Sequence, residues 1–103
     1  IYLNNLDDRF VKPVINEDYF DVYHIFNIRH HKRDKLMSYL FDKGIQTLIH
    51  YPIPPHKQEA YSAYNNLSFP ITEQIHEEVL SLPLSSVMSM EEVEIVVKVV
   101  NNY

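Results

Sequence analysis

Three prolines within four residues, Pro52, Pro54 and Pro55, restrict this chain more than any other feature of its sequence. Proline fixes the backbone φ angle, lacks an amide donor and constrains the residue before it, so no helix or strand can continue through this segment. The preceding residues, Ile45–Tyr51, are largely apolar and typical of a strand. The sequence therefore predicts a strand that stops at Pro52, followed by a stiff, extended turn.

The other apolar segments divide into strand-like and helix-like patterns. Successive residues of Val22–Arg29 would face opposite sides of a sheet, and their β-branched and aromatic content predicts a strand. Leu82–Leu84 predicts a further short strand. Helices are predicted over Lys32–Gly44, Ile71–Ser81 and Ser89–Val100, with a short one over Lys57–Tyr64.

This order of elements predicts one domain over residues 1–103, an α/β (α+β) two-layer sandwich in which helices cover one face of a small, mostly antiparallel sheet. Two helix ends carry their own signals. Gly44, the only glycine, suits a left-handed C-terminal cap, and Ser89 with Glu92 forms a capping box. The helix faces expected to be buried comprise Leu36, Met37, Leu40 and Phe41, then Ile71, Ile75 and Val79, and finally Met90, Val93, Val97 and Val100.

The composition excludes several classes of protein. The chain is 46% hydrophobic with a net charge of −5, a globular pattern that argues against general binding of nucleic-acid phosphates. It has no cysteine, which excludes disulfides, thiolate zinc sites and thiol catalysis and fits a cytoplasmic location. No apolar run approaches the roughly 18 residues of a membrane span, and no signal peptide is visible. Because the chain starts in mid-pattern at Ile1, we expect it to be a piece of a longer protein.

Six histidines raise the question of a metal site, but their spacing argues against one. His30 and His31 are adjacent and would face opposite sides of a strand, and no H-x-H or H-x-x-x-H pair occurs. Glycine-rich phosphate loops and a G-x-S-x-G motif are also missing, and Glu77 and Glu78 are expected on a solvated helix face. We therefore expect neither a metal nor catalytic residues in this chain.

His50 and Tyr51 are the candidate binding residues, because they lie where a strand ends and a rigid loop begins. An imidazole can donate or accept a hydrogen bond, a phenol can donate one, and the prolines lower the entropy cost of holding both. From the residues alone, ligand contact and simple packing of the turn remain equally open. His24 is expected to be half-buried with a hydrogen bond to the backbone, and residues 30–33 to form an exposed turn.

Three segments, VYHIFNIR, RDKLMSYLFDKGIQTLIHYPIPPHKQEAY and FPITEQIHEEVLSLPLSSVMSMEEVEIVV, together resemble a known family. They are similar to the C-terminal domain of the DegT/DnrJ family of pyridoxal-phosphate-dependent sugar aminotransferases, which have the aspartate-aminotransferase-like fold (fold type I). The resemblance covers residues 10–101. The matching residues are Val22 and His24; Lys43, Gly44 and Ile45; His50, Tyr51 and Pro52; Phe69, Pro70 and Glu73; residues 80–83; and Ser89 with Glu92.

The resemblance implies a homodimeric enzyme of two-domain subunits, with pyridoxal 5'-phosphate bound to a lysine of the large domain. The enzyme would pass the amino group of glutamate to a keto sugar of a dTDP- or UDP-linked nucleotide sugar, for polysaccharide, lipopolysaccharide or antibiotic-sugar biosynthesis. The resemblance assigns sugar-nucleotide binding to His50 and Tyr51, more weakly to His56 and Lys57, and a supporting role to His24. Because the cofactor residues belong to the large domain, we expect this chain to bind no cofactor and to have no turnover.

Two other functions remain open. A free-standing α/β domain that binds a small molecule or acts in regulation, without catalysis, would show the same pattern of elements. The sequence upstream of Ile1 would distinguish it from the enzyme, which needs some hundreds of residues there. An RNA-binding sheet of the RRM type fits less well, because no K/R-G-F-G-F-V-like run follows the first strand and the net charge has the wrong sign.

Overall fold

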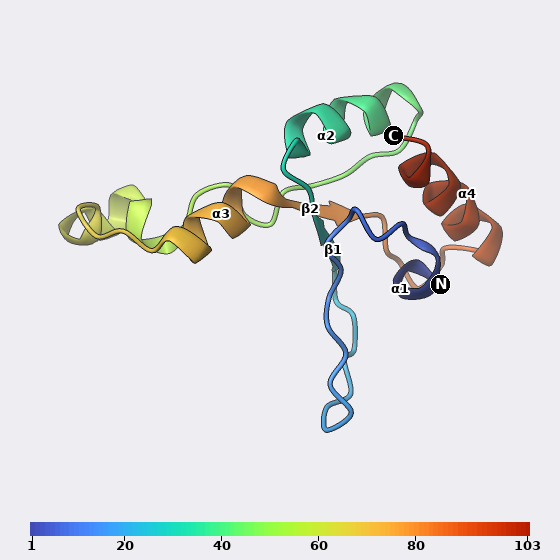
Figure 1. Cartoon of the computed structure of the whole chain (residues 1–103), viewed down its shortest axis with the longest axis horizontal. Helices are drawn as coiled ribbons and strands as arrows, with labels where there is room; N and C mark the ends of the chain where they lie inside the picture. Colours follow the sequence, from blue (N-terminus) through green and yellow to red (C-terminus); the bar gives the residue numbers. More distant parts are fainter.

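Two short antiparallel strands form the centre of the structure, a computed structural model that describes residues 1–103. Strand β1 (Phe26–Arg29) pairs with β2 (Val79–Leu82), and the register places Asn27 opposite Ser81. The two strands cross the middle of the molecule in Figure 1. The small antiparallel sheet predicted from the sequence is therefore present.

Two isolated bridges widen this pair to four extended segments. Val11 pairs with Arg29 on the outer side of β1, and Leu48 pairs with Ser81 on the outer side of β2. The predicted strand Ile45–Tyr51 thus joins the sheet through a single residue, and its prediction as a regular strand is wrong. It pairs no further because the chain turns away into the proline segment, where backbone donors are missing.

Helices and 3-10 turns surround the sheet. In chain order they are α1 (Tyr2–Asn5), α2 (Arg33–Asp42), η1 (Pro55–Lys57), η2 (Glu59–Tyr64), α3 (Pro70–Glu78) and α4 (Met90–Asn101). Figure 1 shows α1, α2 and α4 gathered around one end of the sheet, while α3 leads away from it to η1 and η2. None of these helices is long and apolar enough to cross a membrane.

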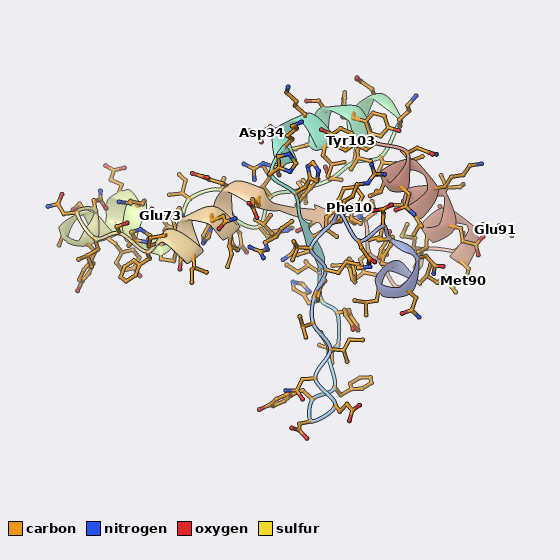
Figure 2. All side chains as sticks on the ribbon, in the orientation of Figure 1. Phe10, Asp34, Glu73, Met90, Glu91 and Tyr103 are labelled. Carbon is orange, nitrogen blue, oxygen red and sulfur yellow. The ribbon has the colours of Figure 1, made fainter.

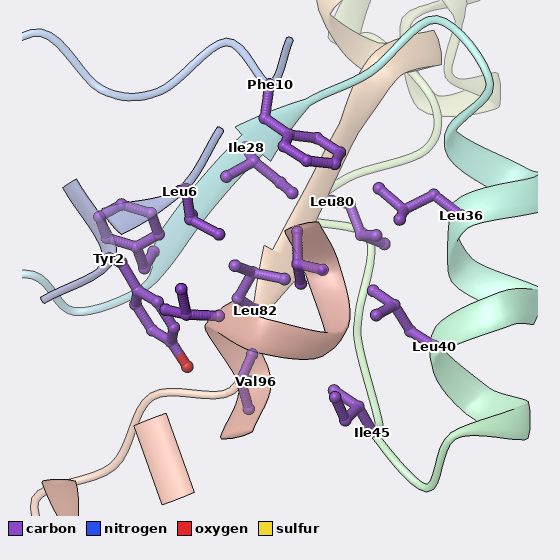
Figure 3. Packing of buried hydrophobic residues seen from close by; sticks show 13 residues of the cluster. Tyr2, Leu6, Phe10, Ile28, Leu36, Leu40, Ile45, Leu80, Leu82 and Val96 are labelled. Carbon is purple, nitrogen blue, oxygen red and sulfur yellow. The ribbon is translucent and has the colours of Figure 1, made fainter. Parts of the chain in front are cut away.

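The hydrophobic core lies between the sheet and helices α1, α2 and α4 (Figure 3). This arrangement confirms the two-layer architecture, with helices packed on the apolar side of a small sheet. The largest side chains with almost no exposed surface are Phe10, Ile28, Leu36, Leu40, Leu80 and Val100.

Two parts of the chain extend away from this core (Figures 1 and 2). One is the projecting arm, residues 12–25, in which Val14 and Phe20 are 94% and 92% exposed. The other is the distal lobe, residues 55–69, which contains η1 and η2. Their extension gives a radius of gyration of 15.2 Å, compared with about 13 Å for a compact domain of 100 residues.

The arm also corrects the predicted start of the first strand. Residues 22–25 belong to the arm, and β1 begins at Phe26. Tyr23 has a positive φ of 48°, and its amide donates to the carboxylate of Asp21 at 2.8 Å. This local turn competes with strand pairing, since an aspartate side chain can bond the backbone two residues on.

The boundary between the predicted helix Ile71–Ser81 and the strand Leu82–Leu84 is wrong by three residues. Helix α3 ends at Glu78, and β2 starts at Val79, whose backbone is extended with φ −69° and ψ 137°. All four residues of β2 are buried, so they lack the alternation that marks a half-exposed strand. Their extended conformation is decided by backbone pairing with β1 on one side and with Leu48 on the other, and not by the local sequence pattern.

The predicted buried faces are confirmed in part. Leu36, Leu40, Val79, Val97 and Val100 are buried, Met37 and Val93 are partly buried, and Phe41, Ile71, Ile75 and Met90 are exposed. The exceptions on α3 lie on a helix that leads away from the sheet (Figure 1), where Ile71 is 76% and Ile75 is 39% exposed.

Both predicted helix caps are confirmed. Gly44 has φ 80°, the left-handed conformation that glycine adopts without a steric penalty. At the start of α4, the Glu92 amide donates to Ser89 Oγ at 3.2 Å, and the Ser89 amide donates to Glu92 Oε2 at 2.7 Å. These local signals succeed because their partners lie within four residues in the sequence.

We expect Leu40→Ala to lower the free energy of unfolding by about 2–5 kcal/mol, because it leaves a cavity at a fully buried position. Its neighbour Phe41 is 69% exposed, so Phe41→Ala is the matched control and should change stability by less than about 1 kcal/mol. Urea denaturation of the 103-residue chain measures both. Equal losses in the two variants would contradict the core described here.

Candidate functional site

The proline loop, residues 50–55, follows the bridge at Leu48 and is tied to α3 and to its own chain. His76 Nδ1 on α3 donates to the carbonyl oxygen of Tyr51 at 2.5 Å, and Gln58 Nε2 donates to the carbonyl of Ile53 at 3.3 Å. The peptide bond between His50 and Tyr51 is cis. The two hydrogen bonds hold the loop at Tyr51 and at Ile53.

The imidazole of His50 is held by a hydrogen bond to a residue of the sheet. Its Nδ1 lies 2.7 Å from Ser81 Oγ, and Ser81 Oγ in turn donates to Asn27 Oδ1 at 2.5 Å. Ser81 is 5% exposed, whereas His50 is half-buried. One edge of the imidazole is thus fixed in the sheet while the rest of the ring reaches the surface.

Tyr51 lies beside His50 and faces outward. The two rings meet edge to face with their centroids 5.4 Å apart, and Tyr51 is 67% exposed. Its hydroxyl makes no hydrogen bond within the chain, so it is free to bond a ligand. The structure therefore brings the two principal candidates together at the surface, and neither ring fills the interior.

His56 and Lys57 are turned toward their own lobe. His56 is 8% exposed, and its Nε2 lies 2.8 Å from Glu73 Oε1. The ammonium group of Lys57 donates to the carbonyl oxygens of Asn65 at 2.8 Å and Leu67 at 2.9 Å. Both side chains are occupied by bonds that brace the distal lobe, and they do not join His50 and Tyr51.

The carboxylate of Glu73 is the hub of this brace. It accepts a hydrogen bond from the Phe69 amide at 3.0 Å as well as the contact with His56. The Phe69 hydrogen bond is the main cause that lowers the pKa of Glu73 below its ordinary value, and the His56 hydrogen bond adds to it. Glu73 therefore stays ionised and anchors the lobe to the start of α3.

Two other predictions about histidines are corrected. His24 is exposed in the projecting arm and makes no hydrogen bond, instead of lying half-buried against the backbone. His30 is 9% exposed rather than part of an open turn, and its ring packs beside Phe10 and Tyr103. Burial is the first cause that lowers the pKa of His30, followed by nearby positive charges, beginning with His31.

Sequence reasoning missed three residues that build the site, namely Asn27, Ser81 and His76. Asn27 and Ser81 are polar residues with apolar neighbours on both sides in the sequence, which is the signal that could have found them. His76 had no such signal, because its partner is a carbonyl 25 positions away. No group of three or more His, Cys, Asp or Glu side chains is placed to hold a metal ion.

The fold matches pyridoxal-phosphate-dependent sugar aminotransferases of fold type I. The crystal structure of DesV from S. venezuelae superposes with a TM-score of 0.91 at 34% identity, over 98% of this chain and 28% of that one. The structure of ntda from Bacillus subtilis with bound cofactor PMP gives a TM-score of 0.84 at 30% identity, over 98% of this chain and 25% of that one.

The sequence places the chain in the same group. Residues 2–101 match the model of the DegT/DnrJ/EryC1/StrS aminotransferase family, and the chain belongs to that family. A dTDP-3-amino-3,6-dideoxy-alpha-D-galactopyranose transaminase from Aneurinibacillus thermoaerophilus is 53% identical over 103 residues, 99% of this chain. A dTDP-3-amino-3,4,6-trideoxy-alpha-D-glucose transaminase from Streptomyces venezuelae is 43% identical over 74 residues, 70% of this chain. The chain spans 28% and 20% of the lengths of these two relatives.

We predict that Glu73→Gln destabilises the chain at neutral pH and that the difference from the unmodified chain shrinks on acidification. The pKa of Glu73 is lowered in the folded state, so its stabilisation is complete above the ordinary value of 4.5 and is lost as the pH falls through the lowered one. Unfolding free energies measured from pH 7 to pH 3 test this.

The control is Glu77→Gln, an exposed carboxylate on the same helix with no partner. Its effect on the free energy of unfolding should be small. A difference for Glu73→Gln that grows on acidification would contradict the assigned brace.

Proposed function

We propose that this chain is the C-terminal domain of a pyridoxal-phosphate-dependent aminotransferase. The parent enzyme transfers the amino group of glutamate to a keto sugar carried by a dTDP- or UDP-linked nucleotide. The observation that carries the proposal is the surface pair His50 and Tyr51 on a braced proline loop, in a chain that belongs to the DegT/DnrJ/EryC1/StrS family. The relatives named as dTDP-amino-sugar transaminases support this substrate class.

In this proposal the proline loop forms part of the nucleotide-sugar pocket. His50 is positioned by Ser81, and the Tyr51 hydroxyl is free, so each can form one hydrogen bond to a polar ligand. Few precisely placed polar groups on a rigid loop are what a sugar-binding site requires. His56 and Lys57 contribute indirectly, because their bonds hold the lobe that follows the loop.

Pyridoxal phosphate would supply the amino-transfer chemistry in the parent enzyme, as the PMP-bound family member suggests. The residues of this chain do not fit that cofactor. A lysine that forms a Schiff base needs a free amine held in a pocket, yet Lys12 and Lys57 are bonded to backbone carbonyls. The other lysines, Lys32, Lys35, Lys43 and Lys98, are exposed to solvent, and none lies in the proline loop. In this proposal the cofactor residues belong to the remainder of the parent protein, and the isolated chain has no turnover.

The parent is further proposed to be a homodimer in which the large domain and the second subunit cover surfaces that are open here. Val14 and Phe20 on the projecting arm and Ile71 on α3 are large apolar side chains with most of their surface exposed. Exposed apolar patches of this kind mark contacts with another polypeptide.

Mixing the 103-residue chain with pyridoxal phosphate should give no stoichiometric, saturable Schiff-base absorption band. Its lysines lie on the surface or are bonded to carbonyls, so only weak, nonspecific adducts form. Free lysine at matched amine concentration is the control for the nonspecific level. A band that saturates at one equivalent would overturn the inactive-fragment proposal.

In the full-length parent enzyme, His50→Ala and Tyr51→Phe should each raise KM for the nucleotide sugar about two- to tenfold, the loss of one hydrogen bond. The effect on kcat should be smaller, because neither group touches the reacting atoms in this proposal. Lys98→Ala, on the exposed face of α4, is the control and should leave KM unchanged. Unchanged KM and kcat in both loop variants would contradict the proposed binding role and leave the loop with a packing role only.

A further inference from the structure

Three polar side chains form a continuous line from β1 through β2 to the proline loop. Asn27 and Ser81 lie opposite each other in the sheet register, and Ser81 Oγ donates to Asn27 Oδ1. On its other side the same oxygen lies 2.7 Å from His50 Nδ1. These hydrogen bonds therefore lead from Asn27 in the sheet to the imidazole of His50 at the surface.

The direction of the Ser81 hydrogen bond indicates which nitrogen of the His50 imidazole carries the proton. A serine hydroxyl has one proton to donate, and Ser81 gives that proton to Asn27. With Asn27 Oδ1 as the acceptor of that proton, the Ser81 oxygen is left to accept from His50, which favours a hydrogen on Nδ1 of the ring. In the neutral ring the other nitrogen, Nε2, is then an acceptor with a free lone pair.

Nε2 of His50 is also accessible at the surface. His50 Nε2 has no hydrogen-bond partner in the chain, and the only buried side-chain polar atom without a partner is Thr47 Oγ1. Nε2 therefore retains exposed surface from which it can meet a ligand.

The backbone around Ser81 keeps this arrangement rigid. The Ser81 amide donates to the Leu48 carbonyl at 2.7 Å, and the Leu48 amide donates to the Ser81 carbonyl at 3.3 Å. Asn27 flanks Ser81 on the opposite side as its register partner. Because Ser81 is pinned between two neighbours and is 5% exposed, its hydroxyl has little freedom to turn toward another partner.

We propose that Asn27 and Ser81 are positioning residues that hold His50 in its Nδ1-protonated tautomer, so that Nε2 accepts a hydrogen bond from a sugar hydroxyl. A neutral imidazole in this state cannot donate to a phosphate oxygen, and it therefore recognises the sugar and not the diphosphate of the ligand. The tautomer follows from this chain alone. The identity of the hydroxyl donor rests on the proposed function.

The tautomer is measured by long-range 15N–1H NMR of the histidine-labelled 103-residue chain, at a pH well above the range in which histidines titrate. His50 should show a protonated Nδ1, in contrast to the exposed and unbonded His24, which serves as the internal reference for the tautomer favoured in water. Ser81→Ala should return His50 to the pattern of His24. Ser85→Ala, in an exposed loop, is the control and should leave His50 unchanged.

Substitutions at Asn27 test whether the hydrogen bonds from Asn27 through Ser81 set the tautomer of His50, or whether any disturbance of the structure changes it. Asn27→Asp keeps an acceptor for the Ser81 proton, so His50 should keep its tautomer. Asn27→Ala frees that proton for His50 and should shift the ring toward the Nε2-protonated form. A native His50 with protonated Nε2, or a tautomer indifferent to both Ser81→Ala and Asn27→Ala in chains with otherwise native amide spectra, would overturn the proposal.

The ligand class is tested in the full-length parent enzyme with free dTDP as an inhibitor that lacks the sugar. His50→Ala and Ser81→Ala should raise KM for the nucleotide sugar about two- to tenfold while the inhibition constant of dTDP stays constant. An equal loss in both would place His50 on the nucleoside diphosphate part of the ligand and contradict the assignment to the hydroxyl of the transferred sugar. An enzyme without turnover on nucleotide sugars would contradict the proposed function, while the NMR result would still decide the tautomer.

Discussion

Ser81 is the residue through which the fold and the candidate site depend on each other. Its backbone bonds Leu48, its register partner is Asn27, and its hydroxyl meets the imidazole of His50. A buried hydroxyl needs partners, since leaving it unpaired costs stability. Here the same partners that satisfy it also fix a surface side chain, so the centre of the sheet determines the geometry of the proline loop.

Apolar surface is unevenly distributed over this chain. The core gathers α1, α2 and α4 on one side of the sheet, while the projecting arm and α3 present Phe20 and Ile71 to solvent. These exposed side chains have no partner within the 103 residues. The chain spans 28% of the length of a relative with which it shares 53% identity.

Local chemistry explains which features could be predicted from the sequence. Gly44 and the Ser89–Glu92 pair act through neighbours within a few residues, and the prolines after Tyr51 stop any regular element by themselves. The candidate ring pair was also predictable, because adjacent residues before a stiff turn stay together. His30 was not, since its burial depends on Phe10 and Tyr103, which come from distant parts of the chain.

The sequence by itself determined the caps, most of the buried faces of α2 and α4, the absence of a helix or strand at Pro52–Pro54 and the family. The tertiary structure alone decided that β2 starts at Val79, that His56 turns inward to Glu73 and that Ser81 connects Asn27 to His50. The physical reason is distance along the chain. Backbone restriction and capping act between neighbours, whereas strand pairing and buried hydrogen bonds join residues that only folding brings together.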